Sequence, residues 1–313
     1  MIIPRDAAPS IPPFLFKEPH SMSNTFTTGE QIARVAAAIA AKDLGVAALV
    51  HRDLGNDFRA GGGKTVHIPV PGATTTSTRP VGSTEDYALG SITEATIPVS
   101  LDTEAYSVVP ITLDEATLDI ENLSRQVIRP QSLTVAHHIA DAVAAAMAET
   151  VADASIAYDA ANPRAAVIRA RAVLRGRGVS ADRPLLAVAG ADVFADLLLA
   201  EQIDADGKVA GVEVHEDTKV PADTLLVFVR EAYAAAIRAP QPPEGAAYAA
   251  SVVEEGMALT HLRALNAANG TTSSIVTTFV GVKALPLPVA NYETGEVELI
   301  DGGGAVAINT TGA

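Results

Sequence analysis

The 313-residue sequence predicts an α+β fold, because strong helical patterns and proline-marked strand patterns fall in separate stretches of the chain. Residues 130–152 repeat hydrophobic side chains at helical spacing, whereas residues 64–110 contain β-branched segments that alternate as strands do. Between residues 163 and 244, helical and strand patterns follow one another closely, which is typical of a compact α/β unit.

Composition narrows the class of protein. Hydrophobic residues make up 48% of the chain but aromatic residues only 4%, so we expect a core of Ala, Val, Leu and Ile. The absence of cysteine excludes disulfides and thiolate chemistry, and it fits a reducing cytoplasm. A net charge of −15 argues against tight binding to nucleic acid, which needs clustered basic residues. Without an apolar run of signal-peptide or membrane-span length, we expect a soluble intracellular protein with no membrane partner.

The N-terminal 50 residues predict an extended arm followed by a helix. Residues 1–24 are rich in proline, and Met22 offers a second start, which would make the first 21 residues an upstream extension. Residues 28–50 predict a helix capped by Thr28, and its hydrophobic face consists of Ile32, Val35, Ala36 and Ile39.

Residues 51–110 predict edge strands joined by a long loop. Pro69, Pro71 and Pro98 keep the strand patterns around them out of the centre of a sheet. The loop between them, residues 72–90, is small and polar, so this two-stranded segment has almost no core of its own. We expect it to need a partner molecule to become ordered.

Helices dominate the next region. Residues 113–128 predict one helix, and Pro130 starts a second that runs to residue 152. The hydrophobic stripe of this long helix consists of Val135, Ile139, Val143 and Met147.

The α/β unit and the segments after it predict an insertion. Its helices are expected at 163–176 and 191–201, and its strands at 184–190 and 210–216. Residues 224–240 predict a strand, then a turn, then a second strand or a short helix. Residues 248–265 and 273–285 predict two paired strands, whose sheet would be completed by strands before residue 113. The α/β unit is then inserted into a discontinuous second domain, and residues 291–313 predict a hairpin with loose ends.

Gly63-Lys64-Thr65 has the ending of a phosphate-binding loop, but its surroundings do not fit one. The motif needs glycine where Phe58 stands, and it needs a following helix whose N-terminus meets the phosphate. A strand pattern containing Pro69 follows instead, so we interpret the stretch as a flexible turn that enters a strand.

Other chemical motifs are equally incomplete. His137 and Asp141 stand four apart on the long helix, which suits a metal pair, but local spacing supplies no further ligand, so polar surface or interface residues are the simpler interpretation. Residues 204–206 resemble a fragment of a calcium loop without its closing glutamate, and are better explained as a turn. No G-x-S-x-G motif occurs, and the sequence predicts no cofactor, no metal and no catalytic residue.

A basic helix interrupts this acidic chain. Its arginines are Arg164, Arg169, Arg171, Arg175, Arg177 and, just beyond it, Arg183. Arg164, Arg171 and Arg175 fall near one face, which either contacts acidic residues of a neighbouring copy, makes weak phosphate contacts, or is a solvated helix face.

The order of these parts resembles the major capsid protein of tailed bacteriophages, with the Hong Kong 97-type fold. The stretches that carry the likeness are 49–72 (LVHRDLGNDFRAGGGKTVHIPVPG), 99–120, 211–240 and 273–285 (SSIVTTFVGVKAL). The resemblance covers residues 22–285 and implies this division: N-terminal arm and helix, 1–50; extended E-loop, 51–110; spine helix and first part of the peripheral (P) domain, 111–160; axial (A) domain, 161–244; second part of the P domain, 245–285; C-terminal tail, 286–313.

The resemblance implies a structural shell protein and not an enzyme. It implies self-assembly into pentamers and hexamers of an icosahedral head around double-stranded DNA, in the virion, after assembly in the host bacterial cytoplasm. The implied partners are other copies, scaffolding and portal proteins, and packaged DNA by weak contact. Candidate inter-subunit contacts are Lys64, Arg59, Arg79, Arg164, Arg171 and Arg175.

Some members of this family join neighbours through a Lys–Asn isopeptide bond. Lys64 is the lysine of the implied E-loop, and Asn266 and Asn269 lie in the returning region. One lysine is little support for a cross-link, so we expect non-covalent assembly. Residues 61–63, all glycine, would let the arm re-aim during assembly.

Two other functions compete with the phage shell. An encapsulin-like nanocompartment resembles the same fold but encloses enzymes. A soluble α/β enzyme would use Asp, Glu and His side chains, which would have to converge in a pocket.

Overall fold

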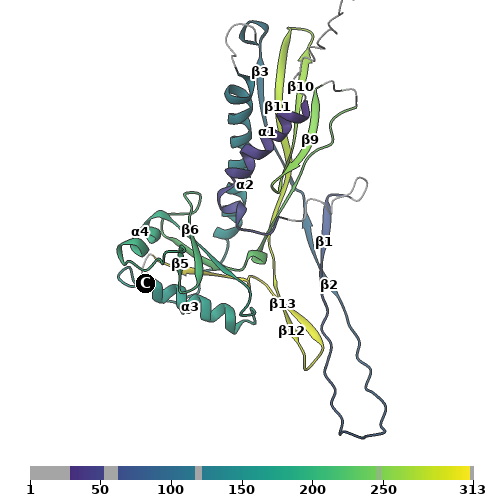
Figure 1. The fold of residues 1–313 in the computed structure, drawn as a ribbon, viewed down its shortest axis with the longest axis vertical. Coiled ribbons are helices and arrows are strands. Elements are labelled where there is room, and N and C mark those ends of the chain that lie inside the picture. The colour runs from purple at the N-terminus through teal and green to yellow at the C-terminus, as the bar shows by residue number, and fades with distance from the viewer. Residues whose placement is uncertain (1–28, 53–62, 117–121, 245, 247, 311–313) are drawn as a thin grey trace, which may run out of the picture.

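The computed structural model describes residues 29–52, 63–116, 122–244, 246 and 248–310, and these form an elongated molecule with three distinct parts (Figure 1). A large sheet with two helices lies at one end, an α/β unit lies beside the other end of the long helix, and a two-stranded arm projects past both. No helix in the described part of the chain has the length and hydrophobicity of a membrane span.

The large sheet is assembled from segments distant in sequence. Its strand order is β3-β11-β10-β9, with β8 paired to the far end of β11, and all pairs are antiparallel. The strands are β3 (Thr103–Ile111), β8 (Tyr233–Arg238), β9 (Ala249–Glu254), β10 (Met257–Asn266) and β11 (Thr271–Ala284). The predicted pairing of the returning segments with each other and with a strand before residue 113 is confirmed, but residues 248–265, predicted as one strand, form the β9–β10 hairpin.

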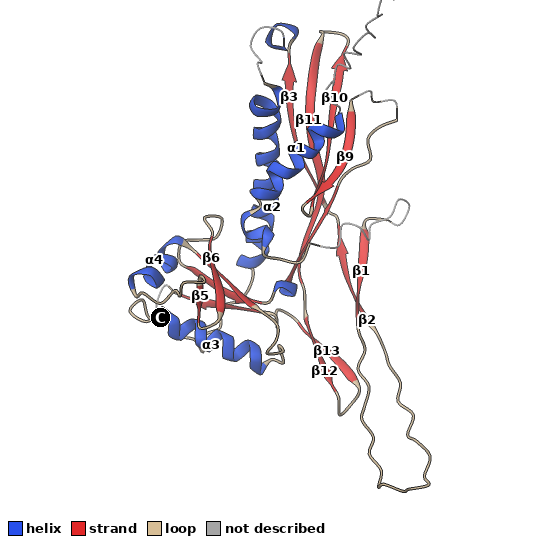
Figure 2. Ribbon diagram, in the orientation of Figure 1, coloured by secondary structure: helices blue, strands red, loops and turns tan. Residues whose placement is uncertain are grey.

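Helices α1 (Gly29–Lys42) and α2 (Arg129–Ala148) cover one face of this sheet (Figure 2). A π-helical turn, Ser124–Ile128, leads directly into α2, with Pro130 in the first turn of α2. The helix predicted to end at residue 128 and the one predicted to start at Pro130 are therefore continuous. The predicted α2 stripe, Val135, Ile139, Val143 and Met147, is fully buried, as expected.

Helix α1 differs from its prediction in length and in buried face. It ends at Lys42, and the short 3₁₀ helix Gly45–Ala48 follows it. Val35 is 43% exposed, whereas the buried side chains are Ile32, Ala33, Ala36, Ala37 and Ala40. Alanines occupy the buried face because α1 packs against both α2 and the β9–β10 strands, where larger side chains have less room.

The α/β unit is built on a second sheet, ordered β14-β7-β4-β6-β5. Its strands are β4 (Leu185–Ala189), β5 (Lys208–Val209), β6 (Val212–Glu216), β7 (Thr224–Phe228) and β14 (Ala305–Asn309). Helices α3 (Pro163–Gly176) and α4 (Ala191–Leu199) pack on it, as the sequence predicts. Strand β8, which the sequence grouped with this unit, instead pairs with β11 in the large sheet.

The tail forms a hairpin that begins before the predicted range of 291–313, and an ordered strand follows it. Strands β12 (Leu287–Asn291) and β13 (Glu296–Ile300) form the hairpin. Strand β14 then pairs with β7, with Ala305 opposite Phe228, and its Val306 and Ile308 side chains are buried. These residues were expected to be loose, and they belong to the α/β core because apolar side chains on alternate positions pack inward.

The arm is an antiparallel pair, β1 (Thr65–Val70) and β2 (Ala95–Ser100), joined by the long loop 71–94 (Figure 1). Thr65 pairs with Ser100 and Val70 with Ala95, and Thr65 Oγ1 lies 2.7 Å from Ser100 Oγ. A small hydrophobic cluster joins the base of the arm to the body through Val70, Ile97, Val99, Ala234, Ala236 and Leu285. The arm is therefore anchored to the body at its base, and its loop projects beyond the β1–β2 ladder.

Candidate functional site

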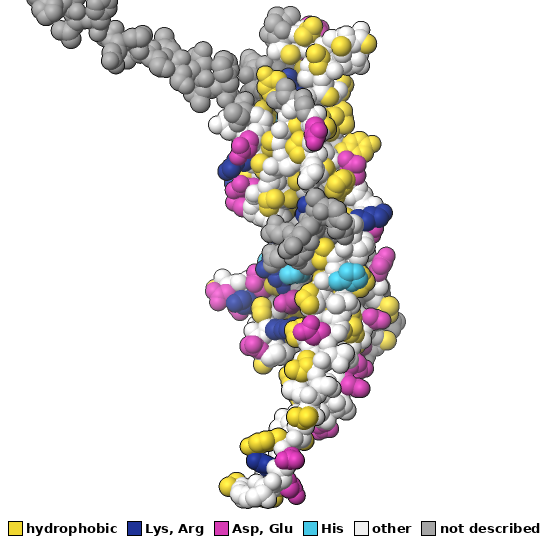
Figure 3. Space-filling view, turned by 90° about the vertical axis from the view of Figure 1, so that its right-hand side faces the viewer, with side chains coloured by type: hydrophobic (Ala, Val, Ile, Leu, Met, Phe, Trp, Pro, Cys, Tyr) yellow, Lys and Arg dark blue, Asp and Glu magenta, His cyan; other side chains and the backbone are white. Residues whose placement is uncertain are grey.

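The loop of the arm presents hydrophobic side chains to solvent. Val81 and Leu89 are almost fully exposed, Tyr87 is 77% exposed and Ile92 is 65% exposed. The Arg79 guanidinium lies 3.9 Å from the centroid of the Tyr87 ring and donates a hydrogen bond to the Glu85 carbonyl. Figure 3 shows hydrophobic and acidic side chains along the arm down to its end. A segment that exposes such side chains without a core is typical of a surface that binds a partner.

The predicted contact residues of the arm differ in their surroundings. Lys64 is exposed at the start of β1, and its carbonyl accepts a hydrogen bond of 2.8 Å from the Leu101 N–H. Arg79 is exposed in the loop, where it stacks on Tyr87. Arg59 lies outside the described residues. The arm therefore leaves at least two of its predicted contact residues open to a second molecule.

The arginines of α3 divide into two groups. Arg171 donates to the Ala210 carbonyl, and Arg175 donates to the carbonyls of Ser180 and, at 2.9 Å, Arg183. Both therefore stabilise the unit's own loops. Arg164 is exposed at the start of α3, as is Arg169 in the middle of the helix. Of the three arginines predicted to share a face, the structure leaves Arg164 as the one open to solvent.

Polar contacts join the α/β unit to the helices of the other part. Asp217 Oδ2 accepts a 2.6 Å hydrogen bond from the Val46 N–H, at the start of the 3₁₀ helix. On α2, the Asp141 carboxylate lies 2.8 Å from Lys219 Nζ, which comes from the loop after β6. His137 does not share a site with Asp141, because its Nε2 lies 3.4 Å from Asp43 Oδ2 instead. Within the described residues no group of three His, Asp or Glu side chains is placed to hold a metal ion.

A buried polar network between α2 and the large sheet has no local signal in the sequence. Gln131 Nε2 donates to the Ser107 and Ser274 carbonyls at 2.9 Å each, and Ser274 Oγ donates to Gln131 Oε1 at 2.8 Å. His261 Nε2 lies 3.1 Å from Ser274 Oγ, so this network assigns the proton of the neutral imidazole to Nε2. Burial, with a smaller effect of the Arg263 charge, lowers the pKa of His261 to about 4.

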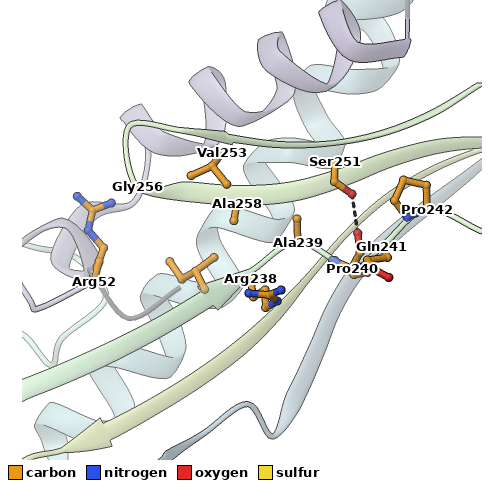
Figure 4. A pocket seen from close by; sticks show the side chains of 11 residues that line it. Arg52, Arg238, Ala239, Pro240, Gln241, Pro242, Ser251, Val253, Gly256 and Ala258 are labelled. Atoms are coloured by element: carbon orange, nitrogen blue, oxygen red, sulfur yellow. Dashed lines mark hydrogen bonds between the residues drawn. The ribbon is translucent and has the colours of Figure 1, made fainter. Parts of the chain in front are cut away.

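One pocket, of about 320 Å³, lies between the end of β8 and the β9–β10 hairpin (Figure 4). Arg52, Arg238 and Ser251 contribute its polar side chains along with Gln241, and apolar residues such as Ile237 and Val253 line the rest. Ser251 Oγ donates to the Pro240 carbonyl at 2.6 Å. Among the described residues, this lining combines a serine with no histidine or carboxylate, so they supply no nucleophile–base–acid set there.

The calcium-like fragment forms a turn, as interpreted from sequence. Asp204 Oδ1 accepts hydrogen bonds from the N–H groups of Asp206 at 3.1 Å and Lys208 at 2.7 Å. The Asp204 carboxylate thus closes its own loop before β5 and is occupied there by backbone donors.

Comparison with known proteins identifies the fold. No family model matches the chain, and no curated protein matches it by sequence. The capsid of Ralstonia phage GP4 is similar with a TM-score of 0.56 and 12% identity, covering 97% of this chain and 99% of that one. The capsid structure of cyanophage P-SCSP1u gives 0.54 at 13% identity, over 87% and 88% of the two chains. The virus-like particle from Pyrococcus furiosus gives 0.51 at 9% identity, over 89% and 97%. The chain therefore has the fold found in phage capsid structures.

Proposed function

We propose that this chain is the major capsid protein of a tailed bacteriophage and that it functions as a structural shell subunit without enzymatic activity. The observation that carries the proposal is the arm, which projects from a body with the phage capsid fold and exposes Val81, Tyr87 and Leu89. A single copy offers these side chains no cover, and a shell supplies neighbours on every side.

We further propose that copies assemble as pentamers and hexamers of an icosahedral head around double-stranded DNA. In this proposal the arm is the E-loop, the large sheet with α1 and α2 is the peripheral domain, and the α/β unit is the axial domain. Scaffolding and portal proteins would assist assembly in the host bacterial cytoplasm, and the mature protein would reside in the virion. The acidic balance of the chain, −15, would limit its binding to the packaged DNA to weak contact.

The contact residues proposed for assembly are those that the fold leaves open. Lys64, Arg79 and Arg164 are exposed and would meet acidic side chains of a neighbouring copy. Arg171 and Arg175 already bind carbonyls within their own unit, so their contribution to an interface would come through the loops that they hold in place.

Electron microscopy of the purified protein in negative stain tests the function. Closed shells or rings of subunits are expected, and a protein that stays monomeric under all assembly conditions would refute the proposal. Replacing Val81, Tyr87 and Leu89 together by serine should abolish shells while the subunit remains folded, because the arm has no core to lose. Val151→Ser is a matched control, since Val151 is 88% exposed but lies outside the arm.

An encapsulin-like compartment is the second candidate, favoured by the similarity to the Pyrococcus furiosus virus-like particle. The contents of particles isolated from producing cells would separate the two functions. Packaged double-stranded DNA supports the phage head, whereas an enzyme enclosed in nucleic-acid-free particles supports the compartment.

Assembly is proposed to be non-covalent. Asn266 and Asn269, the candidate partners of Lys64, accept hydrogen bonds from Ala268 and Thr271 in the β10–β11 turn of their own chain. A denaturing gel of assembled particles should show a single monomer band, and a ladder of multimers would contradict this.

A further inference from the structure

The β12–β13 hairpin lies between the arm and the α/β unit (Figure 1). At its turn, a Cβ placed on Gly295 would lie 3.2 Å from Thr75 Cγ2 and 3.5 Å from the Thr75 nitrogen, so the turn is in contact with the arm. Residues of the arm, including Leu89 and Thr93, and of the turn, including Glu296, face one another across an open cleft of about 570 Å³.

The other end of the hairpin is attached to the α/β unit. A Cβ on Gly178, just after α3, would lie 3.1 Å from Val289 Cγ1 of β12. Leu287 is buried in the main hydrophobic core, and Val289 and Ile300 pack against that core. This end of the hairpin is therefore held by apolar contacts with the body of the α/β unit.

The hydrophobic side chains of the hairpin are divided between two clusters. Val289 and Ile300 pack against the main core, whereas Val297 packs against the separate cluster at the base of the arm. Of the described elements, this hairpin is the one that bridges from the α/β unit to a point on the arm beyond its base.

The turn itself is stiffened by hydrogen bonds. Asn291 Oδ1 accepts from the N–H groups of Glu293 at 2.9 Å and Thr294 at 3.2 Å, and the Asn291 carbonyl accepts from Gly295 N–H at 2.9 Å. Gly295 has φ +74°, a conformation in which a side chain is strained. A hydrogen-bonded turn of this kind bends less readily than an open loop, so a displacement at one end of the hairpin moves the other end with it.

We propose that the β12–β13 hairpin is a brace that sets the direction of the arm relative to the α/β unit, so that the two reorient together. The alternative is that the hydrophobic cluster at the base of the arm sets this direction alone. The proposal concerns the single subunit and does not depend on the proposed shell function.

Distance measurement by electron spin resonance tests the brace. Thr96→Cys on β2 of the arm and Arg169→Cys on α3 place two spin labels at exposed positions on regular elements, and the chain has no other cysteine to react. Labelled protein is diluted into unlabelled protein, so that the distances measured are those within one subunit whether or not it assembles. In the parent background, the distance distribution is expected to be narrow.

Two changes in the hairpin should alter that distribution. Val289→Ser removes an apolar contact with the α/β unit, and Gly295→Val pushes a side chain against Thr75. Both should broaden the distribution and shift its mean, whereas Glu298→Gln, exposed on the same hairpin, should leave it unchanged. The brace is refuted if both Val289→Ser and Gly295→Val retain the parent distribution. Circular dichroism confirms folding of each variant, and Gly295→Ala replaces Gly295→Val if the latter does not fold.

Discussion

His261 is a buried titratable side chain whose neutral form the fold selects. Only 1% of the residue is exposed, and its Nε2 is within a network that ties α2 to β10 and β11. Its pKa falls from 6.5 to about 4 because burial disfavours the charged imidazolium. The unfolded chain therefore binds a proton between these pH values while the folded chain does not. The free energy of unfolding consequently decreases as the pH falls through this window, by roughly 3 kcal/mol in all.

His261→Gln should remove this contribution. Glutamine cannot take up the proton, so the loss of stability between pH 6.5 and pH 4 should become smaller than in the parent. Urea unfolding at several pH values within this window measures the difference. His138→Gln, exposed on α2 and outside this network, is the matched control for the same substitution elsewhere in the chain. Equal pH dependence for His261→Gln and the parent would contradict the assignment.

For individual side chains, the sequence predicts which residues share a face better than it predicts their partners. Val135, Ile139, Val143 and Met147 were predicted to share a buried stripe because helical spacing alone determines which side chains lie on one face. Gln131 and Ser274 contact each other across a long separation in sequence, and no local spacing signals such a pair. His137 illustrates the same limit, since Asp43 rather than the nearby Asp141 is its partner.

Among the elements, β14 is the one whose role in the fold was least visible in the sequence. Its pairing with β7 is reinforced by Arg177, which donates a 3.0 Å hydrogen bond to the Ala305 carbonyl, and by the Asp153 N–H, which donates to the Ala307 carbonyl at 2.8 Å. Helices α3 and α4 were predicted because each carries its own periodic pattern. Membership of a sheet depends on which distant strand lies alongside, and this explains why β8 and β14 were misplaced.

Ile308→Ala should destabilise the α/β unit. Ile308 is 4% exposed in β14, and removing a buried side chain of this size costs about 2–5 kcal/mol. Chemical denaturation followed by circular dichroism measures the change in the free energy of unfolding. Val151→Ala should have almost no effect, since Val151 is already in solvent. If both variants retain the parent stability, β14 contributes little to the unit.

The arm was predicted because the loop between its proline-marked strands has few large hydrophobic side chains and cannot build a core of its own. Gly63 precedes β1 and has φ +82°, a region that other residues adopt at a cost. Replacing Gly61, Gly62 and Gly63 by Ala should therefore slow the re-aiming of the arm during assembly, as measured by light scattering and by electron microscopy of the products. Unchanged assembly and expansion would show that the arm does not pivot at these residues.

For the whole molecule, the charge balance of 22 basic and 37 acidic residues governs how copies approach one another. Like-charged subunits repel, and the repulsion is screened over about 10 Å at 0.1 M salt. Shell assembly should therefore need a lower protein concentration in about 0.5 M than in about 0.05 M NaCl, because the screening length is shorter at the higher salt concentration. Light scattering measures the protein concentration at which assembly begins. An uncharged solute at equal osmolality should not reproduce the change. Weaker assembly at high salt would mean that opposite-charge contacts outweigh the net repulsion.

Over residues 29–310, the elements that the structure describes place three crossings between the α/β unit and the rest of the molecule: after α2, between β7 and β8, and between β13 and β14. A domain joined by one linker can rotate about it, whereas a domain joined by three separate linkers has much less rotational freedom. A protease that severs any single crossing leaves two others intact, so the unit stays attached. Resistance to separation after a single proteolytic cleavage therefore follows from the topology of the chain and does not depend on the strength of any one packing contact.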